Sequence, residues 1–278
     1  MSGFSPQWLD LREPVDHRSR DPWLLNRLSR HFATRGDVAV VDVGCGTGSN
    51  LRATAPHLPA RQSWTLVDYD QNLLDAAVGR LSAWADAATL NDGGLMLAKG
   101  DKRIAVAFRR TDLARDLDEA LGESADLITA AALFDLASPE FIAAFATRVV
   151  RRRAAFYTVL TYDGVQDWTP AHSADAAMVA AFRTHQMGNK GFGPSAGPLA
   201  PGVLKAAFDA AGYRVSEGDT PWELGEVDEA LIADLAVGFA AAVRETGLVA
   251  AETIADWLTV RRTEAIVGHT DTLALPPS

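Results

Sequence analysis

Val38-Ala39-Val40-Val41-Asp42-Val43-Gly44-Cys45-Gly46-Thr47-Gly48 is the stretch of sequence that decides the fold. Its apolar, largely β-branched first half predicts a buried parallel strand over residues 38–43. The glycines that follow predict a tight turn, and they let the backbone approach a ligand where a Cβ atom would collide. A strand that leads into such a turn is typical of α/β proteins that hold a nucleotide-like group.

Strands and helices alternate after this turn. We expect helices over residues 49–57, 71–88 and 139–150, and strands over residues 64–68, 104–108, 126–131 and 153–160. Residues 95–97 should pair with 104–108 as a hairpin around Lys99-Gly100-Asp101-Lys102. The alternation predicts a mostly parallel sheet with helices on both faces, and ligands then bind at the carboxyl ends of the strands.

Two further regions flank this core. Residues 1–35 are expected to be an N-terminal helical segment, whose second helix begins at Asp21-Pro22. Residues 36–278 are expected to form the main domain. Towards its end we predict helices over 203–211, 227–245 and 250–267, and strands over 213–215 and 272–275. The segments 164–200 and 226–267 are its variable parts, suited to cover a substrate.

Composition narrows the class of partner. The 278 residues carry a formal net charge of −10, which repels phosphate backbones and favours a small-molecule substrate over nucleic acid. Cys45 is the single cysteine, so neither an intrachain disulfide nor a cysteine metal cage is expected, and no other metal-ligand spacing occurs. The chain lacks a secretory signal pattern and an apolar run of membrane length. We therefore expect a cytoplasmic protein without a membrane partner or metal; a homodimer is left open.

The glycine turn resembles the first motif of the class I S-adenosylmethionine-dependent methyltransferases. That motif reads acidic-x-Gly-x-Gly-x-Gly after an apolar strand, and Asp42, Gly44, Gly46 and Gly48 occupy its four places. A dinucleotide fingerprint would instead need glycine or alanine where Ser49 stands. The resemblance covers residues 38–160 well. It implies a Rossmann-like, seven-stranded, mostly parallel sheet with an antiparallel last strand, and S-adenosylmethionine as cofactor.

The same resemblance implies which residues bind the cofactor. Asp68, at the end of the second strand, would accept both ribose hydroxyls, since a carboxylate has two oxygens for a cis-diol. Asp70 is better explained as the cap of the next helix. Asp112 would meet the adenine amino group, and Ala130 and Ala131 would lie under the methionine part. The remaining expected contacts are Cys45, Tyr69 and Leu113.

Arg12 is a further candidate from the N-terminal segment. A guanidinium matches the carboxylate of the cofactor bidentately. The competing interpretation is that Arg12 belongs to a charged, solvated helix face. Cys45 itself is expected to be a small turn residue rather than a nucleophile, because no histidine lies near it in the motif.

The sequence says less about which residues would bind the molecule that accepts the methyl group. A hydroxyl or protonated amine acceptor needs a nearby base, which should come from the loops after strands four and five. These loops are expected to supply Phe134, Asp135, Tyr162, Asp163, Trp168, His172 and His185. Tyr162 and Asp163 are favoured because they follow strand five directly, and His172 is a candidate because histidine is the usual proton acceptor in catalysis. The glycine- and proline-rich residues 187–200 form either a lid carrying Phe192 or an exposed connector.

Two alternative functions remain compatible with the sequence. A dinucleotide-dependent oxidoreductase needs the same strand and turn, although Ser49 argues against it. A non-catalytic S-adenosylmethionine-binding or scaffold module would use the helices within 227–267 as a docking surface. Methylation of an exocyclic base amine is disfavoured, because Ala131-Ala132-Leu133-Phe134-Asp135 stands where such enzymes carry an Asn or Asp followed by two prolines and an aromatic residue.

Overall fold

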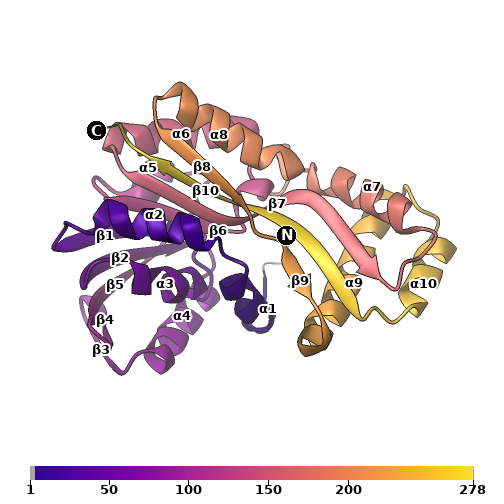
Figure 1. Ribbon diagram of the computed structural model, residues 1–278, viewed down its shortest axis with the longest axis horizontal. Helices are drawn as coiled ribbons and strands as arrows, with labels where there is room; N and C mark the ends of the chain where they lie inside the picture. Colours follow the sequence, from indigo (N-terminus) through magenta and orange to yellow (C-terminus); the bar gives the residue numbers. More distant parts are fainter. Residues whose placement is uncertain (1–3, 278) are drawn as a thin grey trace.

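The computed structural model describes residues 4–277 and is built around one twisted sheet (Figure 1). The strand order is β3-β4-β5-β2-β1-β6-β7-β10-β8, and β9 pairs with β10. The strands are β1 (Asp37–Val43), β2 (Arg61–Asp68), β3 (Ala87–Asn91), β4 (Gly94–Lys99), β5 (Lys102–Arg110), β6 (Leu127–Ala131), β7 (Ala155–Thr169), β8 (Arg214–Asp219), β9 (Trp222–Leu224) and β10 (Glu264–Leu275).

The predicted fold class is confirmed. β5, β2, β1, β6 and β7 are parallel to one another, and β10 runs antiparallel to β7 and β8. These seven strands are the expected core. β4 pairs antiparallel with β5, which confirms the predicted hairpin, and within residues 4–277 the sheet also contains β3 and β9. The predicted helix over 71–88 was too long, because its last residues begin β3.

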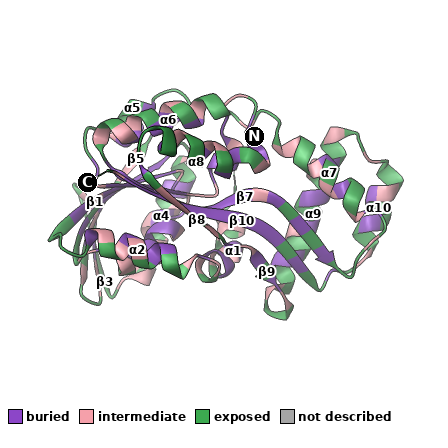
Figure 2. Cartoon of the chain, turned by 45° about the horizontal axis from the view of Figure 1, so that its top comes forward, coloured by how far each residue is buried: buried purple, intermediate pink, exposed green. Residues whose placement is uncertain are grey.

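Helices cover both faces of the sheet (Figures 1 and 2). They are α1 (Pro6–Arg18), α2 (Pro22–Phe32), α3 (Ser49–Thr54), α4 (Gln71–Trp84), α5 (Leu117–Leu121), α6 (Pro139–Arg152), α7 (Asp175–Gln186), α8 (Ala200–Ala210), α9 (Glu229–Thr246) and α10 (Ala251–Thr259). On one face α5, α6 and α8 pack around Phe134, Phe145, Phe156 and Phe208. On the other, α2, α3 and α4 bury Leu24, Leu51 and Leu81.

Both N-terminal helices begin at a capping side chain, and the second begins at Asp21-Pro22 as the sequence predicts. The side chain of Ser5 accepts a hydrogen bond from the backbone of Trp8, and that of Asp21 accepts one from Leu24 at 2.8 Å. Pro22 occupies the first position of α2, where its missing N–H costs nothing.

β7 and β10 continue well beyond the predicted strands. β7 runs past residue 160 to Thr169, and β10 begins at Glu264, so the predictions of a loop after residue 160 and of a helix reaching 267 were wrong. A bulge marks the transition: Leu160 has φ +58°, and its N–H donates to Asp271 Oδ1 at 2.9 Å. A single buried carboxylate on β10 therefore holds the irregular backbone that lets both strands extend.

The extended strands carry a second group of helices. α7, α9 and α10 pack beside the extension at one end of the molecule, and both strands are buried along most of their length (Figure 2). Aromatic rings fill the space between them, with centroid distances of 5.2 Å for Trp168–Trp257 and 4.7 Å for Phe182–Phe239. The segments 164–200 and 226–267 thus supply the helices of one lobe. None of the described helices combines the length and apolarity that crossing a bilayer requires.

Candidate active site

The glycine turn after β1 adopts the backbone that its sequence requires. Gly44, Gly46 and Gly48 have φ values of +63°, +52° and +78°, a region that side-chain-bearing residues avoid. A Cβ atom on Gly46 would stand 3.0 Å from Leu9 Cδ1. The N–H of Cys45 donates to the carbonyl of Val67, which ties the turn to β2. The turn is thus held in one conformation, and Leu9 of α1 covers it at Gly46.

Asp68 ends β2 directly beside this turn. Its Oδ2 accepts the N–H of Gly46 at 2.9 Å, and its Oδ1 accepts the N–H of Asp70 at 3.0 Å. Burial raises the pKa of Asp68, and these N–H groups act in the opposite direction. Each carboxylate oxygen can accept a second hydrogen bond. Asp70, as predicted, caps α4 by accepting the N–H of Asn72.

Asp42, the acidic residue of the motif, faces inward. Its Oδ1 accepts a 2.7 Å hydrogen bond from Asn50, which also donates to Thr129 on β6. Burial raises the pKa of Asp42 to about 7, an effect that Asn50 reduces. Asp42 thus links α3, β1 and β6 below the turn. Sequence reasoning missed Asn50, although its position one turn after the glycines is a local signal.

Helix α1 covers the glycine turn and is held there by ionic contacts. Glu13 forms an ion pair with Arg52 of α3, and His17 Nε2 lies 2.9 Å from Ser49 Oγ. Leu9 fills the space above Gly46. The glycine turn is therefore covered by a helix that is held by polar contacts to α3 and by the apolar side chain of Leu9.

The ends of β2 and β5 border an open cavity of about 420 Å³, lined by Tyr69, Arg110, Thr111 and Asp112. The N–H of Thr111 donates to the carbonyl of Asp68, which holds these ends together. Asp112 is half-exposed and pairs with Arg115, whereas the adjacent Leu113 is buried. The cavity thus adjoins Asp68 on the side where the resemblance expects adenine.

Arg12 is buried rather than part of a solvated helix face. Its guanidinium binds Asp16 bidentately, at 2.9 and 3.1 Å, and lies 4.9 Å from the ring centre of Trp222. Burial raises the pKa of Asp16, although Arg12 counteracts the shift. The expectation of an exposed charge is therefore wrong. Arg12 has one further nitrogen beyond those that Asp16 binds.

A second group of polar residues gathers where β6, β7 and β10 meet, and we call Asp135, Tyr162 and His269 the polar cluster. Tyr162 pairs with His269 across β7 and β10, with ring centres 6.4 Å apart. Asp135 follows β6 in a short 3₁₀ turn, Phe134–Leu136. Burial raises the pKa of Asp135 to about 6 and lowers that of His269 to about 3. Tyr162 and His269 are thus neutral at pH 7, and Asp135 is ionised.

The backbone at the end of β6 is also unusual. Ala131 is the last residue of the strand, and Ala132 has φ +50°, a conformation that costs alanine about 1 kcal/mol or more. The N–H of Ala132 donates to the carbonyl of Val159 on β7. This turn connects β6 to the 3₁₀ turn Phe134–Leu136, which contains Asp135.

The other predicted acceptor-side residues do not join the polar cluster. Asp163 lies within β7, not in a loop, and accepts the N–H of Val165. His172 lies beyond β7, where its Nδ1 accepts the N–H of Ala174 and its Nε2 lies 3.1 Å from Asp256 of α10. His185 pairs with Glu245 of α9. Of the three proposed catalytic residues, the structure places only Tyr162 beside Asp135.

The segment 187–200 packs against the turn that carries Asp135. Phe192 packs at a tilt against Phe141 of α6, with ring centres 4.6 Å apart, and Ser195 Oγ donates to the carbonyl of Leu136 at 2.8 Å. The N–H of Ala196 donates to the carbonyl of Ala137. The segment 187–200 therefore stabilises the turn that carries Asp135, and Phe192 packs against α6.

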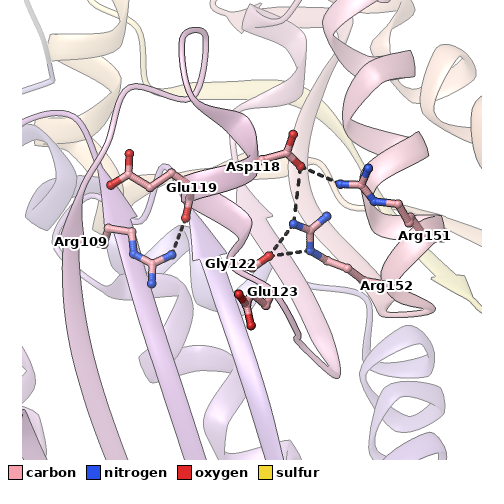
Figure 3. A pocket seen from close by; sticks show the side chains of 7 residues that line it. All are labelled: Arg109, Asp118, Glu119, Gly122, Glu123, Arg151 and Arg152. Carbon is pink, nitrogen blue, oxygen red and sulfur yellow. Dashed lines mark hydrogen bonds and ion pairs between the residues drawn. The ribbon is translucent and has the colours of Figure 1, made fainter.

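Another cavity, of about 690 Å³, lies between α5 and α6 (Figure 3). Its arginines are already engaged: Arg109 binds the carbonyl of Glu119, and Arg152 binds the carbonyl of Gly122 and approaches Asp118. Cations at the carboxyl end of a helix complement its dipole. The arginines of this cavity therefore hold α5 in place, and these contacts explain their presence.

Comparisons with solved structures match almost the whole chain. A cyclopropane-fatty-acyl-phospholipid synthase-like protein from Lactobacillus casei superposes with a TM-score of 0.56 at 13% identity, covering 98% of this chain and 95% of its own. A cyclopropane synthase from Mycobacterium tuberculosis gives a TM-score of 0.51 at 11% identity, covering 98% and 94%. A Bacillus halodurans protein described as a methyltransferase gives 0.50 at 13% identity, covering 91% and 99%. The chain has the class I methyltransferase fold.

No family model and no curated protein sequence matches the chain. The class I methyltransferase fold nevertheless fixes which strand ends meet, and these are the ends that carry Asp42, Asp68 and Asp135. Sequence reasoning missed His269 because it began the last strand at residue 272. The signal was present: Ile266, Val267 and Thr270 give the preceding residues a strand-like, β-branched composition.

Proposed function

We propose that this protein transfers a methyl group from S-adenosylmethionine to a nitrogen or oxygen atom of a small molecule. One observation carries the proposal: the Asp68 carboxylate, at the end of β2, is bound to the backbone of Gly46 and keeps lone pairs for a ribose diol. The class I methyltransferase fold supports this assignment because it brings these two residues together.

The residues present fit the cofactor. The left-handed glycines give a backbone without Cβ atoms, Asp68 suits the ribose, and the cavity beside Asp112 and Tyr69 adjoins it. When bound, S-adenosylmethionine supplies an activated methyl group. The chain's part is then to hold the acceptor in line and to exclude water, for which α1, which covers the glycine turn, is well placed.

The acceptor is proposed to be a small molecule because of charge. A net charge of −10 disfavours a polyanionic substrate. The polar cluster is buried, so an acceptor must be small enough to enter it.

Calorimetric titration with S-adenosylhomocysteine tests the proposal. Saturable binding at one site is expected. Asp68→Ala should weaken it at least a hundredfold, because two hydrogen bonds to a charged acceptor contribute about 1.5–3 kcal/mol each. Asp75→Ala, which removes an exposed carboxylate on α4 that binds Gln71, is the matched control and should bind normally. Circular dichroism must show that each variant is folded, and absence of binding by folded wild-type protein would refute the proposal.

A further inference from the structure

The polar cluster holds three buried polar atoms without a hydrogen-bond partner among the described residues. They are Asp135 Oδ1, Tyr162 Oη and His269 Nδ1, on residues that are 7%, 4% and 6% exposed. A buried polar atom left without a partner costs about 1–3 kcal/mol. Three such atoms on three different elements indicate a place where a polar ligand completes the hydrogen bonding.

The polar cluster adjoins the proposed cofactor site. β6 pairs with β1 so that Thr129 lies beside Asp42, and the two strands end on the same side of the sheet. Asp135 follows β6 by four residues, after the left-handed turn at Ala132. Asp135 therefore lies just past the end of β6, where Ala130 and Ala131 are expected to contact the methionine part of the cofactor.

The charges around Asp135 leave it as the unbalanced group of the cluster. Arg12, from α1, is neutralised by its bidentate contact with Asp16. Tyr162 from β7 and His269 from β10 are uncharged, and Ser195 from segment 187–200 binds a backbone carbonyl. Tyr162 also lies near Asp163 of β7 and Arg183 of α7. The Asp163 carboxylate accepts the N–H of Val165, and Arg183 donates to the carbonyl of Gly164. Asp135 is therefore the carboxylate of the polar cluster that can both hold a proton and oppose a positive charge.

We propose, on the basis of the proposed function, that Asp135 faces the transferred methyl group and takes the proton of an acceptor that presents an N–H or O–H group. Tyr162 and His269 hold that acceptor by hydrogen bonds. The acceptor's lone pair bonds to the methyl carbon, the electrons of the broken carbon–sulfur bond stay on sulfur, and the proton goes to the Asp135 carboxylate. Atoms and charges balance without a further reactant.

Two cofactor analogues test this without knowledge of the acceptor. Sinefungin carries a protonated amine where S-adenosylmethionine carries its methylated sulfonium, whereas S-adenosylhomocysteine is neutral there. If Asp135 faces this position, wild-type protein should prefer sinefungin, and Asp135→Asn should reduce the preference about tenfold. The wild-type preference should also fall as the pH drops through about 6, where Asp135 takes up a proton.

Glu217→Gln is the control, because it removes an exposed carboxylate, on β8, by the same change from acid to amide and should leave the preference unchanged. Should Asp135→Asn not fold, Asp135→Ser takes its place with the same expected loss of preference, because burial also raises the pKa of Asp42 to about 7 and that of Asp271 to about 6, so the wild-type pH dependence alone does not single out Asp135. Equal binding of both analogues, unchanged by pH or by Asp135→Asn, would overturn the inference and leave the proposed function standing. Binding of neither analogue by folded protein would refute both.

Discussion

The proposed site has a cofactor half, at the ends of β1 and β2, and an acceptor half, at the ends of β6, β7 and β10. The two halves differ in how their buried carboxylates are hydrogen-bonded. At the ends of β1 and β2 each buried carboxylate is bonded: both oxygens of Asp68 accept backbone N–H groups, and Asp42 Oδ1 accepts from Asn50, although Asp42 Oδ2 has no partner among the described residues. At the ends of β6, β7 and β10, Asp135 Oδ1 has no partner among the residues that the structure describes. A cofactor of constant shape suits a preformed, satisfied backbone, whereas an acceptor brings its own hydrogen bonds.

Arg12 lies between these halves. Its replacement should produce the largest change in free energy among the variants discussed below. Arg12→Met leaves Asp16 buried without its counter-ion, which should lower the free energy of unfolding by about 3–5 kcal/mol. Chemical denaturation measures this change, and adding Asp16→Leu should recover part of it. Loss of S-adenosylhomocysteine binding at unchanged stability would instead assign Arg12 to the cofactor half.

Gly46 tests the rigidity of the cofactor half. Gly46→Ala places a side chain in a left-handed conformation and 3.0 Å from Leu9. We expect S-adenosylhomocysteine affinity to fall by about 2 kcal/mol, or roughly thirtyfold. Gly79→Ala, on α4 with open space around it, should bind as wild type does. Unchanged affinity in Gly46→Ala would mean that the turn does not approach the ligand.

His269 gives the acceptor half a distinct pH dependence. Its folded pKa of about 3 lies below the unfolded value of about 6.5, so the unfolded state binds more protons between these values and stability is lost as the pH falls. This residue should cost the wild type about 2 kcal/mol between pH 7.5 and pH 5. His269→Gln should show a correspondingly smaller fall in Tm over that range. An identical pH profile would show that His269 is accessible to water.

His172 should matter least. It pairs with the exposed Asp256 at the outer part of the lobe, and such a pair contributes about 0–1 kcal/mol. His172→Gln should therefore leave S-adenosylhomocysteine affinity unchanged and alter the free energy of unfolding by no more than about 1 kcal/mol. A large loss of methyl transfer in this variant would restore His172 as a catalytic candidate and extend the acceptor half into the lobe.

The same contrast explains what the sequence could predict. The strand, the glycine turn and Asp68 follow local rules of composition and spacing, because adjacent residues determine them. The long extension of β7 depends on Leu160 meeting Asp271, which is 111 residues away in sequence. The polar cluster likewise depends on how β7 and β10 are paired. The composition around His269 indicates a strand, but no local pattern shows which residue of β7 it faces, so Tyr162 was found without its neighbour His269.

The central claim is methyl transfer to a small molecule. The most direct test incubates the protein with a whole-cell extract and isotopically labelled S-adenosylmethionine, separates small molecules from nucleic acid and protein, and analyses each fraction by mass spectrometry. We predict a small-molecule product that gains one labelled methyl group with wild-type protein and is absent with Asp68→Ala. Label recovered only in nucleic acid, or no labelled product from protein that binds S-adenosylhomocysteine, would contradict the account.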